Sequence, residues 1–98
     1  MADEQKFTTT FPMDFTIADK FGIGAIKDTF NRAFKEWKSD YRYLTHLVIA
    51  LNHKIWEWHE KGNQAYAKLY NELWEKADGY ACDNLTGDEL RYFYKETD

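Results

Sequence analysis

Residues 40–62 constrain the fold of this chain more than any other stretch. Their sequence, DYRYLTHLVIALNHKIWEWHEKG, repeats apolar residues at the spacing of an α-helix. One face of this helix carries the residues Tyr41, Leu44, Leu47, Val48, Leu51, Ile55 and Trp58. Ile49 and Trp56 lie beside the stripe and widen the apolar arc beyond the roughly 100° of an ordinary surface helix. A helix that is apolar around so much of its surface is either central in a bundle or shared with a partner.

A second long helix is predicted before the central one, over residues 25–38. Its apolar face consists of Ile23, Ile26, Phe30, Ala33, Phe34 and Trp37. At the junction with the central helix, either Ser39 or Asp40 can act as a cap by accepting a backbone N–H.

A third long helix is predicted after Gly62, a residue type that readily takes the left-handed conformation at a helix end. Asn63 is suited to cap this helix. Its apolar stripe consists of Tyr66, Leu69, Tyr70, Leu73, Trp74, Ala77, Tyr80 and Ala81. Gly79 interrupts the pattern and is expected to bend or end the helix near Asp78.

The last predicted element is a short helix over residues 87–95. Thr86 and Glu89 have the spacing of a capping box, in which each side chain bonds the backbone N–H of the other residue. Leu85 and Leu90 stand at the positions of a hydrophobic staple.

The N-terminal part has a different pattern. Residues 1–14 are expected to be loose or extended. Residues 1–10 are polar and rich in threonine, and Phe11, Met13, Phe15 and Ile17 then alternate with other residues at the period of an extended segment. Residues 17–21 have room for one helical turn before Gly22. The sequence therefore predicts an all-α protein in which residues 1–98 form a single domain. It is a small bundle of three long helices and one short C-terminal helix, with an extended N-terminal arm.

Composition and charge restrict the class of protein. The single cysteine, Cys82, excludes an internal disulfide, and no leader or membrane span is evident, so we expect a cytoplasmic protein. Residues 20–54 hold seven Lys/Arg and three Asp/Glu, whereas residues 55–98 hold five and ten. The net charge of −4 therefore conceals a basic middle beside an acidic C-terminal half.

No catalytic, cofactor or metal site is indicated. His46 and His53 lie about 10 Å apart along one helix at a rise of 1.5 Å per residue, too far apart to bind one metal ion. Cys82 lies beside Asp83, which disfavours a reactive thiolate. Gly22 and Gly24 lack the rest of a phosphate-binding motif. We therefore predict that the protein is not an enzyme and has no small-molecule substrate.

Partner binding is the more informative possibility. Trp56 and Ile49 fall outside the core stripe, and tryptophan on a partly exposed patch is a frequent binding anchor. The alternative is that the N-terminal arm or the last helix covers these two residues. A second candidate surface is the basic face of the second helix, with residues Lys27, Arg32, Lys35, Lys38 and Arg42. This face suits acidic protein or RNA phosphates.

Three segments of the chain also carry a resemblance to known proteins. At LTHLVIALNHKIWEWHEKG, LYNELWEKAD and DNLTGDELRYFYKETD, it resembles small helical proteins of bacteria and their phages, over residues 15–98. Small phage proteins of this kind are often inhibitors of host defence, including anti-CRISPR proteins, which act in the bacterial cytoplasm. The resemblance implies a protein or ribonucleoprotein target, such as a CRISPR nuclease or its guide RNA, but it assigns no site residues.

Three functions follow as hypotheses. The first is a binding protein that inhibits a host defence nuclease by occupying its surface. The second is a helical homodimer with a structural or regulatory role, in which the apolar arc of residues 40–62 forms the self-interface. The third is a nucleic-acid-binding module that uses the basic second helix.

Overall fold

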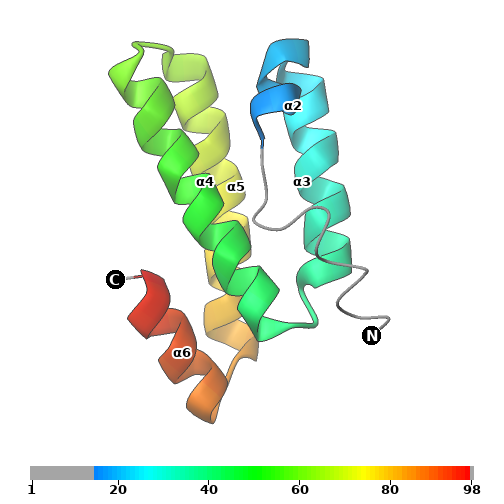
Figure 1. Ribbon diagram of the computed structural model, residues 1–98, viewed down its shortest axis with the longest axis vertical. Helices are drawn as coiled ribbons and strands as arrows, with labels where there is room; N and C mark the ends of the chain where they lie inside the picture. Colours follow the sequence, from blue (N-terminus) through cyan, green and yellow to red (C-terminus); the bar gives the residue numbers. More distant parts are fainter. Residues whose placement is uncertain (1–14, 98) are drawn as a thin grey trace.

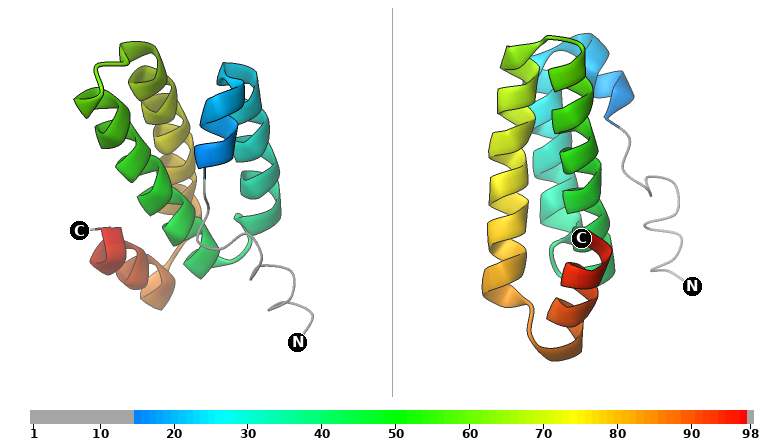
Figure 2. Two further views of the ribbon diagram at one scale, coloured as in Figure 1. Left: turned by 45° about the horizontal axis from the view of Figure 1, so that its top comes forward. Right: turned by 90° about the vertical axis from the view of Figure 1, so that its left-hand side faces the viewer.

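Helix α4 (Tyr41–Glu60) lies at the centre of an all-α bundle, as the sequence predicts (Figure 1). The computed structural model describes residues 15–97, and within them every element is a helix. The other helices in this range are α2 (Thr16–Phe21), α3 (Ile23–Trp37), α5 (Gln64–Asn84) and α6 (Gly87–Thr97). The α4 and α5 helices form an antiparallel hairpin, α2 and α3 cover one side of it, and α6 packs at the opposite end (Figures 1 and 2).

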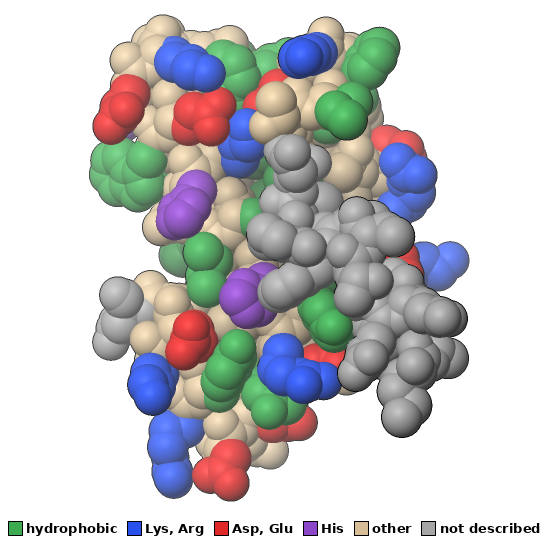
Figure 3. Space-filling model, in the orientation of Figure 1, with side chains coloured by type: hydrophobic (Ala, Val, Ile, Leu, Met, Phe, Trp, Pro, Cys, Tyr) green, Lys and Arg blue, Asp and Glu red, His purple; other side chains and the backbone are tan. Residues whose placement is uncertain are grey.

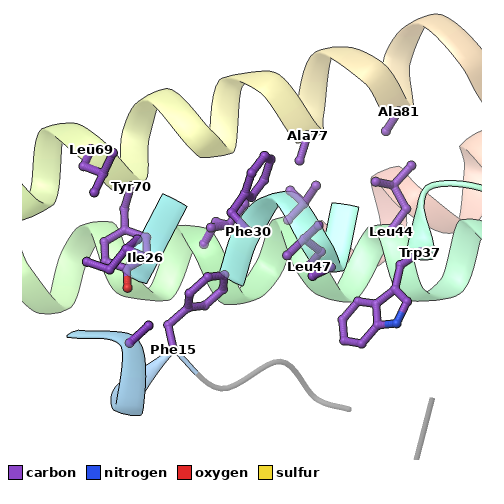
Figure 4. Close-up of a cluster of buried hydrophobic side chains, with 14 of the residues drawn as sticks. Phe15, Ile26, Phe30, Trp37, Leu44, Leu47, Leu69, Tyr70, Ala77 and Ala81 are labelled. Carbon is purple, nitrogen blue, oxygen red and sulfur yellow. The ribbon is translucent and has the colours of Figure 1, made fainter. Parts of the chain in front are cut away.

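The broad apolar arc of α4 is buried within the chain itself. Leu44, Leu47, Val48 and Leu51 are each no more than 1% exposed. They meet side chains from α3 and α5 in one cluster, in which Trp37 and Tyr70 are the largest fully buried side chains (Figure 4). The helix is therefore central because three other helices, α3, α5 and α6, share its circumference.

Local capping signals explain where the long helices begin. The Asp40 carboxylate accepts a hydrogen bond from the backbone N–H of Arg42 at 2.9 Å, and Asn63 accepts one from Tyr66 at 3.1 Å. Between α4 and α5, Gly62 has a φ of +78°, the left-handed conformation that favours glycine. The predicted starts of α4 and α5 and the turn between them are confirmed.

Two predictions about the C-terminal half are wrong in detail. Gly79 does not end α5, which continues to Asn84. The α6 helix does begin at Gly87, but the Thr86 hydroxyl makes no hydrogen bond among the described residues. The backbone N–H of Glu89 bonds the carbonyl oxygen of Thr86 instead, at 3.2 Å. The helix start follows the sequence signal, whereas the predicted side-chain cap does not form.

The N-terminal segment shows a further difference. The arm predicted for residues 1–14 lies outside the described residues. The extended alternation predicted to continue to Ile17 is not found, because helix α2 begins at Thr16. The helical turn predicted before Gly22 is confirmed by the same helix. Phe15 and Ala18 face the core, while Ile17 is exposed. The sequence pattern predicts Ile23 on the core face of α3, but Ile23 is 43% exposed because it lies in the first turn of α3, at the junction with α2.

Leu51→Ala is expected to destabilise the protein by roughly 2–5 kcal/mol, the usual range for a leucine cavity in a core. Leu51 is fully buried in the middle of α4, so the cavity cannot be filled by solvent. Urea unfolding followed by circular dichroism measures this loss. A change below about 1 kcal/mol would contradict a central position for α4.

Candidate functional site

Three large apolar side chains are exposed where α2 meets α3. We call Ile17, Phe21 and Ile23 the α2–α3 corner; Phe21 is 79% exposed and Ile17 is 67% exposed. Ile17 and Phe21 are four residues apart on the face of α2 opposite Phe15 and Ala18, so they cannot reach the core. Figure 3 shows hydrophobic side chains at the end of the bundle where α2 and α3 join.

The apolar periodicity of the sequence does not by itself predict this corner. The available signal was the spacing of Ile17 and Phe21, which places both on one face of a short helix while Ala18 lies on another.

A buried polar cluster attaches α2 to the α4–α5 hairpin. The Lys54 ammonium lies 2.7 Å from one carboxylate oxygen of Asp19, and the Tyr70 hydroxyl donates a hydrogen bond to the other oxygen. The Tyr66 hydroxyl donates to the backbone carbonyl of Asp19 at 3.2 Å. Beside these bonds, the rings of Phe15 and Tyr70 meet edge to face with centroids 5.4 Å apart. The orientation of α2, and with it the corner, is therefore fixed by contacts from α4 and α5.

The charges of the cluster extend along α4 to the surface. Glu57 lies 3.3 Å from the ammonium of Lys54 and 3.2 Å from that of Lys61. Burial acts to lower the pKa of Lys54, but Asp19 and Glu57 outweigh it, and the pKa is raised above its ordinary value of 10.5. Burial likewise acts to raise the pKa of Glu57, but Lys61 and Lys54 outweigh it, and the pKa is lowered from 4.5.

The direction of each shift defines a pH range. The raised pKa of Lys54 gives stability that is complete below pH 10.5 and is lost as the pH rises through the raised value. The lowered pKa of Glu57 gives stability that is complete above pH 4.5 and is lost as the pH falls through the lowered value. Lys54 and Glu57 are therefore both ionised throughout the neutral range.

The structure places Ile49 and Trp56 in different surroundings on α4. Trp56 is 58% exposed, with its ring 5.8 Å from that of His59. Ile49 is half-buried in a groove of about 330 Å³ beside the end of α6. The residues lining this α6-end groove are Val48, Ile49, Asn52, His53, Trp74, Asp78, Glu96 and Thr97. The last helix thus partly covers Ile49 and stops short of Trp56.

The five basic residues predicted as a second surface are partly neutralised. Arg32 pairs with Asp28 at 3.5 Å, and the guanidinium of Arg42 donates to Asp40, the main cause of its raised pKa. Lys38 lies 5.8 Å from the ring centroids of both Phe34 and Tyr80.

Lys27 and Lys35 are exposed and have no ion pair within residues 15–97. Acidic side chains of α3, Asp28 and Glu36, interrupt the surface between the basic groups. The five residues therefore do not form a continuous basic strip.

The remaining titratable groups are dispersed over the surface. Burial lowers the pKa of His46, and nearby Glu96 opposes this effect. Cys82 is exposed, with its sulfur 3.9 Å from the Tyr94 hydroxyl. Across residues 15–97, no three side chains among His, Cys, Asp and Glu come together in a way that could hold a metal ion.

Comparisons of the chain with protein-family models, with curated proteins and with solved structures find no match. None of the helices in the described range combines the length and the apolar character that crossing a membrane requires.

Asp19→Ala is expected to destabilise the protein by about 3 kcal/mol, at the lower end of the range for removing one partner of a buried ion pair. Lys54 would keep only Glu57, at 3.3 Å, as its partner. The double variant Asp19→Leu/Lys54→Met removes both charges, so its loss in urea unfolding should be smaller than that of Asp19→Ala. A larger loss in the double variant would show that the ion pair itself provides the stability.

Asp78→Asn is expected to stabilise the protein at pH 7. Burial raises the pKa of Asp78 above its ordinary 3.8, so its favourable contribution exists below that pH and is lost as the pH rises through the raised pKa. The urea midpoint of the variant should exceed that of the parent at pH 7 and match it at pH 3. A gain of equal size at both pH values would assign the effect to packing instead.

Proposed function

We propose that this protein is a binding protein that docks on a macromolecular partner through the α2–α3 corner and inhibits that partner by occupying its surface. One observation carries the proposal. Among residues 15–97, three of the five exposed large hydrophobic side chains lie within the seven residues from Ile17 to Ile23. Contiguous exposed apolar groups on a folded domain are typical of interaction sites.

The position of Trp56 supports an interface at the same end of the bundle. It lies one turn before the end of α4, at the end where α2 and α3 join (Figure 1). The charged side chains of Lys54, Glu57 and Lys61 belong to the same end of α4. Two apolar anchors with charged groups between them resemble the composition of a protein interface, in which aromatic contacts are accompanied by polar ones.

The partner class follows from the resemblance to phage and bacterial proteins. We propose a host defence nuclease of the CRISPR type as the target, contacted mainly on its protein surface. Lys27 and Lys35 would add contacts to acidic protein or guide RNA at the edge of the interface. No self-interface is proposed through the arc of α4, because those side chains are buried inside the chain.

The test begins with a set of purified CRISPR nucleases, each loaded with guide RNA and incubated with the protein before target DNA is added. Phe21→Ser should weaken inhibition of the sensitive nuclease at least tenfold, as expected for an interface anchor. Trp56→Ala should weaken it less. Tyr94→Ser is the matched control, because Tyr94 is also an aromatic residue that is about half exposed but belongs to α6. Circular dichroism verifies that each variant is folded.

A charge reversal separates this proposal from nucleic-acid binding. Phosphate contacts lose affinity steeply as salt rises, whereas an apolar anchor depends weakly on salt. If Lys35→Glu/Lys38→Glu alone abolished binding, with a steep salt dependence, the nucleic-acid module would replace the present proposal. Full inhibition by folded Phe21→Ser would exclude the α2–α3 corner as the interface.

A further inference from the structure

The α6-end groove exists because α6 is shorter than the hairpin on which it packs. Along the first half of α4, α6 covers the surface closely: Thr45 is fully buried and the rings of Tyr41 and Tyr92 are 5.2 Å apart. The helix ends at Thr97, while α4 and α5 continue beyond it (Figure 2). The groove therefore continues the surface of α4 and α5 against which α6 packs.

The size and walls of the groove suit one side chain rather than a large ligand. Its volume of about 330 Å³ is at the lower end of the range for small-molecule pockets. Val48 is buried, while Ile49 and Trp74 are half-buried, so each contributes apolar surface to the lining. Histidine and hydrophobic side chains are visible over the middle of α4 in Figure 3.

Two carboxylates and the imidazole of His53 are the titratable side chains in the groove lining. The carboxylates are those of Asp78 and Glu96, from two different helices, and the lining includes no Lys or Arg. Neither carboxylate has an ion-pair partner among the described residues. The carbonyl end of α6 adds partial negative charge at the same place. An occupant with positive charge would therefore complement the groove.

A cation with a hydrocarbon stem fits these walls better than a bare ion. The indole ring of Trp74 offers a surface on which a guanidinium or ammonium group is attracted, and Ile49 offers apolar contact for a stem. Guanidinium groups also match carboxylates with two parallel hydrogen bonds. Two carboxylates fall well short of the six to eight oxygen ligands that Ca²⁺ takes in proteins.

We propose that the α6-end groove receives a lysine or arginine side chain of a protein partner. Asp78 and Glu96 pair with the charged group, and Trp74 and Ile49 pack against its stem. This surface is separate from the α2–α3 corner, so the inference does not depend on the function proposed above.

The test is a titration of the full chain, followed by nuclear magnetic resonance of the backbone amides. The probe is Nα-acetyl-arginine amide, and Nα-acetyl-norleucine amide is the uncharged control with a similar stem. Saturable shifts are expected at Ile49, Asn52 and Asp78 with a Kd of roughly millimolar, typical of one side chain. The norleucine probe should bind at least tenfold more weakly. Equal binding of the two probes would overturn the proposal, because charge would then have no role.

Matched variants test whether the carboxylates of the groove bind the charged group of the probe. Asp78→Asn/Glu96→Gln should weaken arginine binding at least tenfold. Glu72→Gln/Glu75→Gln removes the same number of charges from exposed positions of α5 and should change binding less than twofold. Glu96→Gln alone, at an exposed position, keeps the test valid if the double variant does not fold. Equal losses in the two double variants, or tighter binding of free putrescine than of the arginine probe, would overturn the proposal.

Discussion

The ion pair between Asp19 and Lys54 determines where helix α2 lies on the α4–α5 hairpin. Without it, α2 would meet the hairpin mainly through Phe15 and Ala18, too little apolar surface to fix a six-residue helix. Exchanging a buried ion pair for apolar residues is often neutral in stability, so its main effect here is to specify one orientation. Two tyrosines fix the same orientation. The Tyr70 hydroxyl donates a hydrogen bond to the carboxylate of Asp19, and the Tyr66 hydroxyl donates one to its backbone carbonyl.

Each side of the central helix α4 makes a different kind of contact. The stripe of Leu44, Leu47 and Leu51 builds the core, and Lys54 near the end of that stripe carries the polar attachment of α2. A further side is covered by α6 for about half its length, which leaves Trp56 in solvent. Both proposed binding surfaces arise where a short helix, α2 or α6, leaves apolar groups uncovered.

The structural features that could be predicted from the sequence are those that depend on residues close together along the chain. The stripe of α4 and the caps at Asp40 and Asn63 follow from periodicity and from bonds that span two or three residues. The burial of Lys54 could not be predicted, because its partner lies 35 positions away. The different exposure of Ile49 and Trp56 depends on where α6 ends in space. The direction of Phe21 likewise depends on how α2 is attached.

The separation between Asp19 and its partners also sets an order of assembly. Contacts within the α4–α5 hairpin close a turn of a few residues, whereas the bonds from Asp19 to Lys54 and Tyr70 close loops of 35 and 51 residues. Short loops cost less entropy to close, and the partners of Asp19 are brought together only when the hairpin exists. The attachment of α2 is thus a late event in folding. A chain that has not finished folding has no ordered α2–α3 corner, so only the completed bundle presents the surface proposed for partner binding.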